Sequence, residues 1–228
     1  MVSRHRYFCT NITSQTFILK GISMKIFQNS IRVGFNPMKN RKRVNLATVF
    51  IFLVIVILVY IGHIKLTGNF HVVSAGRCYR SGQLSPGLLT KYVHQYEIKS
   101  ILNLRGENPD KNWYVEEMNT SNTLNINHYD VSLSSTQRPT HEDLVQLSKI
   151  FRDAPRPILI HCEGGADRSG LVAAMWKVCV DKASKSDAKQ QLSFWFGHFP
   201  VFATREMDRF FDAWYSDGIN HDAFEPCM

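Results

Sequence analysis

One cysteine of this chain lies in a segment whose residue types could carry nucleophilic chemistry on an anion. The segment is HCEGGADRSG, residues 161–170, and Arg168 follows Cys162 by six positions. A thiolate is a strong nucleophile, and a guanidinium can donate two parallel hydrogen bonds to an oxyanion. Gly164 and Gly165 allow the backbone between them to turn its N–H groups inward. The segment therefore predicts an oxyanion-binding loop that carries a nucleophile.

The residues on both sides of this loop predict the elements that hold it. Residues 157–160 form a short apolar run that predicts a buried central strand, and residues 171–176 begin a strongly apolar helix. A loop between a strand and a helix N-terminus places Cys162 near the positive end of the helix dipole, which together with Arg168 favours the thiolate. Parallel sheets bind ligands beyond the carboxyl ends of their strands, and Cys162 falls there.

Each position of the loop has an expected role in the hydrolysis of a phosphate ester. Cys162 attacks phosphorus, and Arg168 binds two of the equatorial oxygens. Ser169 is expected to donate a hydrogen bond to the sulfur, and His161 to orient the loop. We therefore expect a phosphomonoesterase that works through a phosphocysteine, with no metal and no cofactor. The backbone N–H groups that bind phosphate are expected at Glu163, Gly164, Gly165, Ala166, Asp167 and Arg168.

Apolar patterns and capping residues predict one α/β domain over residues 69–217. Ser85 before Pro86, and Thr140 with Asp143 three residues later, are typical of helix N-termini. Strands that alternate with helices predict a three-layer sandwich, with a mainly parallel central sheet flanked by helices. The expected strands are residues 69–73, 77–80, 100–104, 124–129 and 157–160. The expected helices are residues 86–96, 110–121, 140–152, 186–196 and 204–216, together with the helix that begins with residues 171–176.

An apolar run before this domain predicts a membrane anchor. Residues 46–62 read LATVFIFLVIVILVYIG, just long enough to cross the hydrocarbon core as a helix, and we expect a transmembrane helix over residues 44–62. Basic residues gather before the run, whereas only Lys65 follows it closely, which predicts a cytoplasmic N-terminus and a periplasmic catalytic domain in a bacterium. The alternative is a cleaved signal peptide and a secreted domain.

The charge of the chain is confined to its N-terminal end. Residues 1–43 hold nine Lys and Arg residues and no acidic residue, whereas the rest of the chain holds 18 basic and 19 acidic residues. The formal charge of +8 therefore belongs to a basic N-terminal tail, and no nucleic-acid partner is expected. Residues 218–228 are expected to form a C-terminal tail. Translation is expected to begin at Met38 or Met24, and the sequence makes no prediction of oligomeric state.

The loop resembles the Cys-x5-Arg-Ser/Thr signature of the protein tyrosine phosphatase superfamily. Residues 79–83 (YRSGQ) and 101–105 (ILNLR) resemble the opening segments of its compact bacterial dual-specificity phosphatases, several of which are periplasmic or membrane-tethered. The resemblance covers residues 69–215. It implies the cysteine-phosphatase fold, a phosphorylated protein or small phosphorylated metabolite as substrate, and an upstream aspartate as general acid.

Asp130 is the expected general acid, because it precedes Cys162 by 32 residues and ends a predicted strand. A residue that caps a turn is the alternative reading of Asp130. Asp143 also precedes the loop, but its place in the first turn of a helix explains it as a capping partner. Asp167 departs from the commoner pattern, in which a small residue precedes the arginine. It is read equally well as a functional residue, an additional acid or one that tunes substrate choice, or as a residue stabilised by the helix N-terminus.

Several other residues are expected to have no part in the chemistry. Five scattered cysteines predict neither a disulfide framework nor a zinc site, and Cys78 is expected to be a buried bystander rather than a redox partner of Cys162. The aromatic residues Trp195, Phe196 and Phe199 are expected in the core or in an interface. Four histidines have no paired spacing that would predict a metal site: His94, His128, His198 and His221.

Two other functions remain compatible with the sequence. A rhodanese-like sulfurtransferase also places a cysteine at the start of an anion-binding loop, but Arg168 followed by Ser169 favours phosphate. A phosphate-binding pseudophosphatase would retain the loop but lack the acid. Intact Cys162 and Arg168 argue against that alternative.

Overall fold

A computed structural model describes residues 45–216, in which five short strands form one mixed sheet. The strand order is β1-β2-β5-β3-β4, with β1 antiparallel to β2 and the other three pairings parallel. The strands are β1 (His71–Ser74), β2 (Cys78–Ser81), β3 (Ser100–Asn103), β4 (Asn127–Asp130) and β5 (Ile158–His161). The expected strand that leads into the loop is therefore the central strand of the sheet.

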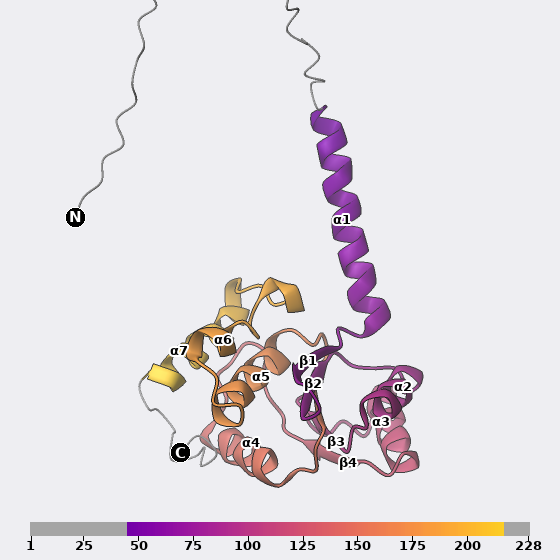
Figure 1. The fold of residues 1–228 in the computed structure, drawn as a ribbon, viewed down its shortest axis with the longest axis vertical. Helices are drawn as coiled ribbons and strands as arrows, with labels where there is room; N and C mark the ends of the chain where they lie inside the picture. Colours follow the sequence, from indigo (N-terminus) through magenta and orange to yellow (C-terminus); the bar gives the residue numbers. More distant parts are fainter. Residues whose placement is uncertain (1–44, 217–228) are drawn as a thin grey trace, which may run out of the picture. The chain divides into compact units, whose positions relative to one another are not determined.

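Helices cover both faces of this sheet, with α2 and α3 on one side and α4 to α7 on the other (Figure 1). The expected arrangement of a sheet flanked by helices is confirmed, as a mixed sheet with one antiparallel edge strand. The helices are α1 (Leu46–Thr67), α2 (Pro86–Tyr96), α3 (Asn112–Thr123), α4 (His141–Asp153), α5 (Asp167–Cys179), α6 (Lys185–Lys189) and α7 (Arg205–Ser216), and two 3-10 turns are η1 (Phe194–Phe196) and η2 (Phe202–Thr204).

The central strand β5 is apolar throughout because both of its faces are buried. Ile158 and Ile160 pack into the core on the side of α4, α5 and α7, whereas Leu159 packs into the core on the side of α2. Successive side chains of a strand point to opposite faces, so a strand between two helical layers needs apolar residues at every position. This burial fixes where β5 ends, and therefore where Cys162 begins the loop.

The predicted helix starts at Ser85 and Thr140 are confirmed. The Ser85 hydroxyl accepts from the N–H of Leu88 at 3.4 Å, and Pro86 occupies the first turn of α2. Thr140 and Asp143 form a complete capping box at the start of α4. Each cap satisfies backbone N–H groups that have no partner within the helix.

The expected helix over residues 186–196 is wrong. Helix α6 ends at Lys189, and the chain turns so that the carbonyl of Gln191 can accept from the buried guanidinium of Arg80 at 2.6 Å. A separate turn, η1, follows and ends at Gly197, which has a φ of +81°. The buried guanidinium of Arg80 needs hydrogen-bond acceptors, and this requirement outweighs the helical pattern after Lys189.

Three other expected boundaries move by a few residues. Helix α3 begins at Asn112 instead of residue 110, and α5 begins at Asp167 instead of residue 171. Strand β4 begins only at Asn127, because residues 124–126 close the end of α3, with Asn125 in the left-handed region at a φ of +51°. The earlier start of α5 matters for function, because it brings the helix N-terminus directly onto the loop.

Helix α1 contains 22 residues, from an N-cap at Asn45 to a left-handed Gly68 with a φ of +65°. It is long and apolar enough to cross a membrane by length and composition. It continues five residues beyond the expected end at Gly62. The expectations for residues 1–43 and 218–228, including the start sites at Met24 and Met38 and His221, lie outside the described residues.

Candidate active site

Cys162 follows β5 directly and lies beneath the N-terminal turn of α5. Its side chain is almost fully buried, with 2 % of the residue exposed. The Cys162 sulfur lies 3.5 Å from the hydroxyl oxygen of the buried Ser169, in the first turn of that helix. The structure therefore brings these two predicted residues together, and Ser169 is placed to donate a hydrogen bond to a thiolate.

The carbonyl groups of the loop are all held on one side. The carbonyl oxygens of residues 163–166 accept hydrogen bonds in sequence: from the N–H of Gln83 at 2.9 Å, from the side-chain amide of Asn69 at 3.0 Å, and twice from Arg80 at 2.9 and 3.0 Å. In a trans peptide the following N–H points away from the carbonyl. Four N–H groups, of residues 164–167, consequently face the other way, an arrangement of the kind that anion-binding nests use.

The tight approach of β2 to the loop explains why a glycine occupies position 165. Gly165 has a φ of +71°, and a Cβ atom there would lie 2.4 Å from the backbone nitrogen of Gly82. By contrast, a Cβ atom on Gly164 would meet nothing within 4 Å. Of the two predicted glycines, Gly165 is the one that the turn requires.

Arg80 holds the carbonyl side of the loop, although no role for this single residue was predicted from the sequence. This arginine is completely buried in β2, and its guanidinium donates to the carbonyls of residues 165 and 166 and to Gln191. Burial lowers its pKa to about 10, partly offset by nearby acidic groups such as the Cys162 thiol, so Arg80 remains charged at neutral pH. A charged residue within a short buried strand was the signal that could have revealed it.

Arg168 lies at the mouth of the loop, with 15 % of its side chain exposed. Its guanidinium is 3.4 Å from the carbonyl oxygens of Leu104 and Leu133, which follow β3 and β4. The carboxylate of Glu163 lies 4.0 Å away on the solvent side. These contacts hold the guanidinium loosely and leave donors for an anion.

His161 contacts a buried carboxylate that was not predicted from the sequence. Glu117 of α3 lies 3.1 Å from Nε2 of His161 and 2.9 Å from Nε2 of His128, and it accepts from Gln83 at 2.6 Å. Burial opposes ionisation of Glu117, but the two imidazoles lower its pKa below the usual range. Burial also lowers the pKa of His128, yet Asp130 and Glu117 raise it to about 9.

The expectation that the histidines have no spacing suited to a metal site is corrected by a cluster of three residues, Glu117, His128 and His161. His128 and His161 are 33 positions apart in sequence, but both rings meet at Glu117, and their donor atoms lie within 4.8 Å of one another. This separation is close enough for a metal ion. The hydrogen bonds between them already satisfy the ring nitrogens that face the carboxylate, so the cluster also functions as a purely protein network.

Asp130 belongs to this network instead of to the open side of the loop. Its oxygens accept from the side-chain amide of Asn103 at 2.7 Å and from the hydroxyl of Tyr114 at 2.9 Å, and His128 Nδ1 lies 3.3 Å away. Burial raises the pKa of Asp130, but the nearby imidazole of His128 and the donors Tyr114 and Asn103 outweigh burial and lower it. A carboxylate with two hydrogen-bond donors and an imidazole beside it is stabilised in its ionised form.

Asp167 has a partner of its own in the first turn of α5. Its carboxylate lies 2.7 Å from Nδ1 of His198, whose Nε2 lies 2.9 Å from Asp208 of α7. His198 is completely buried, which lowers its pKa, but the two carboxylates outweigh burial and raise it. His198 therefore joins the loop to α7, a role that its sequence position did not predict.

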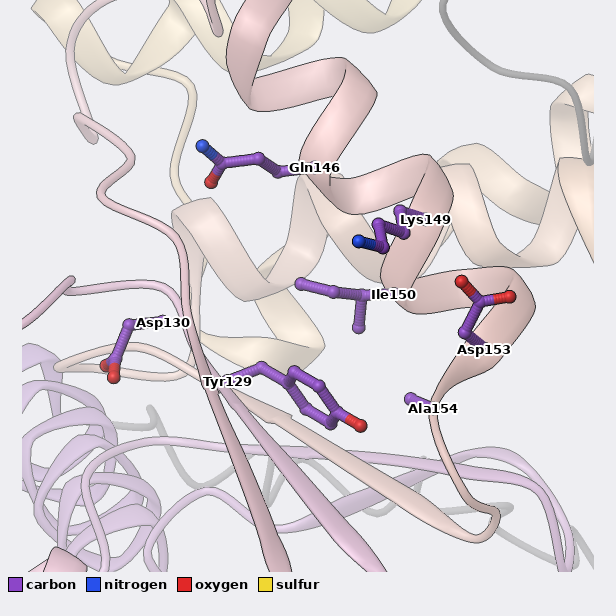
Figure 2. A pocket seen from close by; sticks show the side chains of 7 residues that line it. All are labelled: Tyr129, Asp130, Gln146, Lys149, Ile150, Asp153 and Ala154. Carbon is purple, nitrogen blue, oxygen red and sulfur yellow. The ribbon is translucent and has the colours of Figure 1, made fainter.

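A pocket beside Tyr129 and Asp130 lies on the face of the sheet opposite to the network around Glu117. Figure 2 shows Tyr129 pointing toward α4 between Ile150 and Ala154, while Asp130 points to the opposite side of β4. No residue of the loop lines this pocket. Its seven lining residues are Tyr129, Asp130, Gln146, Lys149, Ile150, Asp153 and Ala154.

Cys78 lies far from the nucleophile, as expected of a bystander. It pairs in register with Ile158 at the start of β5, four residues before Cys162. At about 3.3 Å per residue this register separates the two cysteines by roughly 13 Å along the strand. Because a disulfide requires Cα atoms within about 7 Å, the alternative of a redox pair is wrong.

Comparison with known proteins assigns most of the described chain to a family. Residues 68–206 match the family PTP-NADK, described as a DSP-PTPase phosphatase fused to NAD+ kinase. The core catalytic domain of the PP-IP phosphatase SIW14 from S. cerevisiae, solved with citrate, is 26% identical with a TM-score of 0.52, over 68% of this chain and 90% of that chain. TpbA from P. aeruginosa is 19% identical with a TM-score of 0.54, over the same shares. No curated protein matches the sequence.

The matched residues begin at the end of α1 and extend into α7, so they include the sheet, the loop and the His198 contact. The likeness to TpbA shows the same fold, and the match to the family covers more than half of the chain. The chain belongs to the DSP-type PTPase family PTP-NADK and is a compact dual-specificity-like phosphatase.

Proposed function

We propose that this phosphatase hydrolyses phosphate monoesters through a covalent phosphocysteine at Cys162. The observation that carries the proposal is the loop itself. A buried sulfur lies 3.5 Å from Ser169, under a helix N-terminus, while the carbonyls of residues 163–166 are tied back and leave their N–H groups for an anion. A sulfurtransferase would have no need of the guanidinium of Arg168 beside this nest.

The proposed reaction has two steps. The Cys162 thiolate attacks phosphorus, an S–P bond forms, and the P–O bond to the leaving group breaks while an acid gives that oxygen its proton. Water then attacks phosphorus and gives a proton back to the same acid, the S–P bond breaks, and the thiolate and inorganic phosphate are released. Ser169 stabilises the departing sulfur, and Arg168 and the nest bind the phosphoryl oxygens in both steps.

The proposed substrates are phosphotyrosine in proteins and small phosphorylated metabolites. Citrate and phosphotyrosine occur in structures of the relatives SIW14 and TpbA, and SIW14 is described as a PP-IP phosphatase. These ligands belong to those proteins. For this chain, the direct test is hydrolysis of p-nitrophenyl phosphate by the full-length protein in membranes, and absence of metal-independent hydrolysis would contradict the proposal.

The contacts of the two candidate acids favour Asp167 over Asp130. Asp130 has donors on both oxygens and a lowered pKa, and its side chain belongs to the network around Glu117. Asp167 is part of the loop and partly exposed, with 27 % of its side chain accessible. We therefore propose Asp167 as the acid, and the prediction for Asp130 stays untested.

Two matched amide variants distinguish these acids. Asp167→Asn is expected to lower kcat on a phosphotyrosine peptide by roughly 10²–10⁴-fold, the usual contribution of general acid catalysis. It should lower kcat on p-nitrophenyl phosphate far less, because nitrophenolate departs without a proton. Asp130→Asn is expected to affect both substrates equally, because it disturbs the orientation of His161. The reverse pattern, measured as kcat for both substrates, would restore Asp130 as the acid.

We further propose that α1 crosses the membrane and holds the catalytic domain outside the cytoplasm. Support comes from the length and composition of the helix and from the basic residues before it. Alkaline phosphatase fused after Met228 is expected to be active in a bacterial host, because that enzyme matures only outside the cytoplasm. An inactive fusion that is expressed at a normal level would reverse the orientation.

A further inference from the structure

A run of aromatic and apolar side chains is largely exposed on the surface. Here residues 194–202 are called the aromatic segment. Trp195 is 68 % exposed and Phe202 is 96 % exposed, and three other apolar residues of the segment are more than half exposed. These three are Phe194, Phe199 and Val201. An exposed apolar cluster of this kind is typical of an interaction site, so of the two expected places, core or interface, the exposure of Trp195 and Phe199 favours an interface.

The aromatic segment lies against the last turns of α1. The hydroxyl of Tyr60 donates to the carbonyl oxygen of Phe194 at 2.6 Å. A Cβ atom added to Gly197 would lie 3.8 Å from the side chain of Ile64, so the two residues are neighbours. Tyr60 and Ile64 are also partly buried, whereas the four preceding turns of α1 are exposed. One face of α1 therefore fixes the height of the aromatic segment along the helix.

The sequence of α1 defines where that height falls in a bilayer. The uncharged apolar run begins at Leu46 and ends at Gly62, before His63 and Lys65. Seventeen residues at 1.5 Å each span about 26 Å, close to the hydrocarbon thickness of about 30 Å. Tyr60 then lies at the boundary between acyl chains and headgroups, where tyrosine and tryptophan are enriched in membrane proteins.

We propose that the aromatic segment inserts into the boundary of the same bilayer that α1 crosses, with Trp195 and Phe202 as its lipid contacts. The inference rests on the proposed membrane crossing of α1. It assigns the exposed apolar surface to lipid instead of to a protein partner, because the segment is bonded to the anchor at the level of the interface. Amphipathic indole rings favour this boundary. Because Trp195 is already exposed, its insertion needs no movement of the fold.

The same segment is joined to the phosphate loop. The side-chain amide of Asn69 donates to the carbonyl of Gly164 at 3.0 Å and to that of Phe196 at 2.8 Å. The guanidinium of Arg80, which holds the loop, lies 4.6 Å from the centre of the Phe196 ring. Lipid insertion therefore holds the catalytic loop at a fixed position beside the membrane surface, within reach of phosphate groups carried there.

Quenching by brominated lipid tests the contact directly. The full-length protein is placed in nanodiscs made with lipids that carry bromine near the headgroup end of the acyl chain, and in matched discs without bromine. We expect bromine to reduce tryptophan emission in the unaltered protein, and Trp195→Phe to remove most of that reduction. Phenylalanine keeps an exposed aromatic ring at position 195, so the variant is expected to fold.

Trp113→Phe is the matched control, because Trp113 lies in α3 and packs 3.5 Å beneath the guanidinium of Arg105, away from the aromatic segment. In this variant, bromine should still reduce tryptophan emission. Equal quenching in the unaltered protein and Trp195→Phe, or none in either, would overturn the inference. The second result is also the one expected if a protein partner covers the segment.

Hydrolysis of p-nitrophenyl phosphate is measured on the same discs. Quenching without hydrolysis would reject the proposed function alone, and hydrolysis without quenching would reject the lipid contact alone.

Discussion

Replacing Cys162 with serine is expected to abolish hydrolysis, with a loss in kcat of roughly 10⁴-fold or more, as for other covalent nucleophiles. A serine hydroxyl is similar in size but stays protonated at neutral pH, so it fits the buried site without attacking phosphorus. Only 2 % of Cys162 is exposed, and the backbone of the loop is expected to stay unchanged in the variant. The measurement is the steady-state rate with p-nitrophenyl phosphate.

Cys78→Ala supplies the matched control for this variant. It also removes a completely buried thiol, but one that lies at the other end of the sheet, paired with Ile158. We expect this protein to lose some stability and to retain most of its activity, because Cys78 lies at the end of β2 that is farther from the loop. Substantial turnover by Cys162→Ser would exclude a covalent mechanism through this sulfur.

Arg168→Lys is expected to lower kcat/KM by roughly 10²–10³-fold, the usual effect of removing a preorganised donor to a transition-state oxyanion. Lysine keeps the charge but presents a single ammonium, which cannot donate two parallel hydrogen bonds to two phosphoryl oxygens. The guanidinium is anchored only by two carbonyls at 3.4 Å, so the shorter, differently shaped ammonium loses its position as well. Kinetic constants with p-nitrophenyl phosphate and the inhibition constant of orthovanadate measure both effects.

The control for Arg168→Lys is Arg77→Lys. Arg77 precedes β2 at the opposite end of the sheet from the loop, where it forms a partly exposed ion pair with Asp181. Surface pairs of this type contribute about 1 kcal/mol or less, so this variant should match the unaltered protein. If Arg168→Lys also matched it within a factor of two, bidentate binding of phosphate by Arg168 would be wrong.

The sequence predicted the parts of the molecule that depend on local pattern. The helix caps at Ser85 and Thr140, the apolar strand over residues 157–160 and the loop that follows are each specified by neighbouring residues. Gly165 is a further example, because a left-handed turn against β2 accepts glycine and little else. These elements place Cys162 at the carboxyl end of the central strand before any tertiary contact is known.

The sequence could not predict the contacts that join distant segments. Arg80 binds Gln191, which is 111 residues away, and this contact interrupts the helix expected over residues 186–196. Glu117 gathers histidines from β4 and β5, although its own helix carries no motif. These polar groups bond to one another because burial removes water as their alternative hydrogen-bond partner. Burial depends on the tertiary fold, so the local sequence does not predict the network. The role of Asp130 is difficult to predict for the same reason.

The most direct test of the central claim is to trap the phosphocysteine during turnover. The full-length protein is mixed with p-nitrophenyl phosphate, denatured with acid within the first turnover, digested and analysed by mass spectrometry. The mechanism predicts one phosphoryl group on the peptide that contains Cys162, absent from Cys162→Ser and increased in Asp167→Asn if Asp167 also activates water for the second step. Turnover with no phosphoryl group on Cys162, or with one on another residue, would contradict the account.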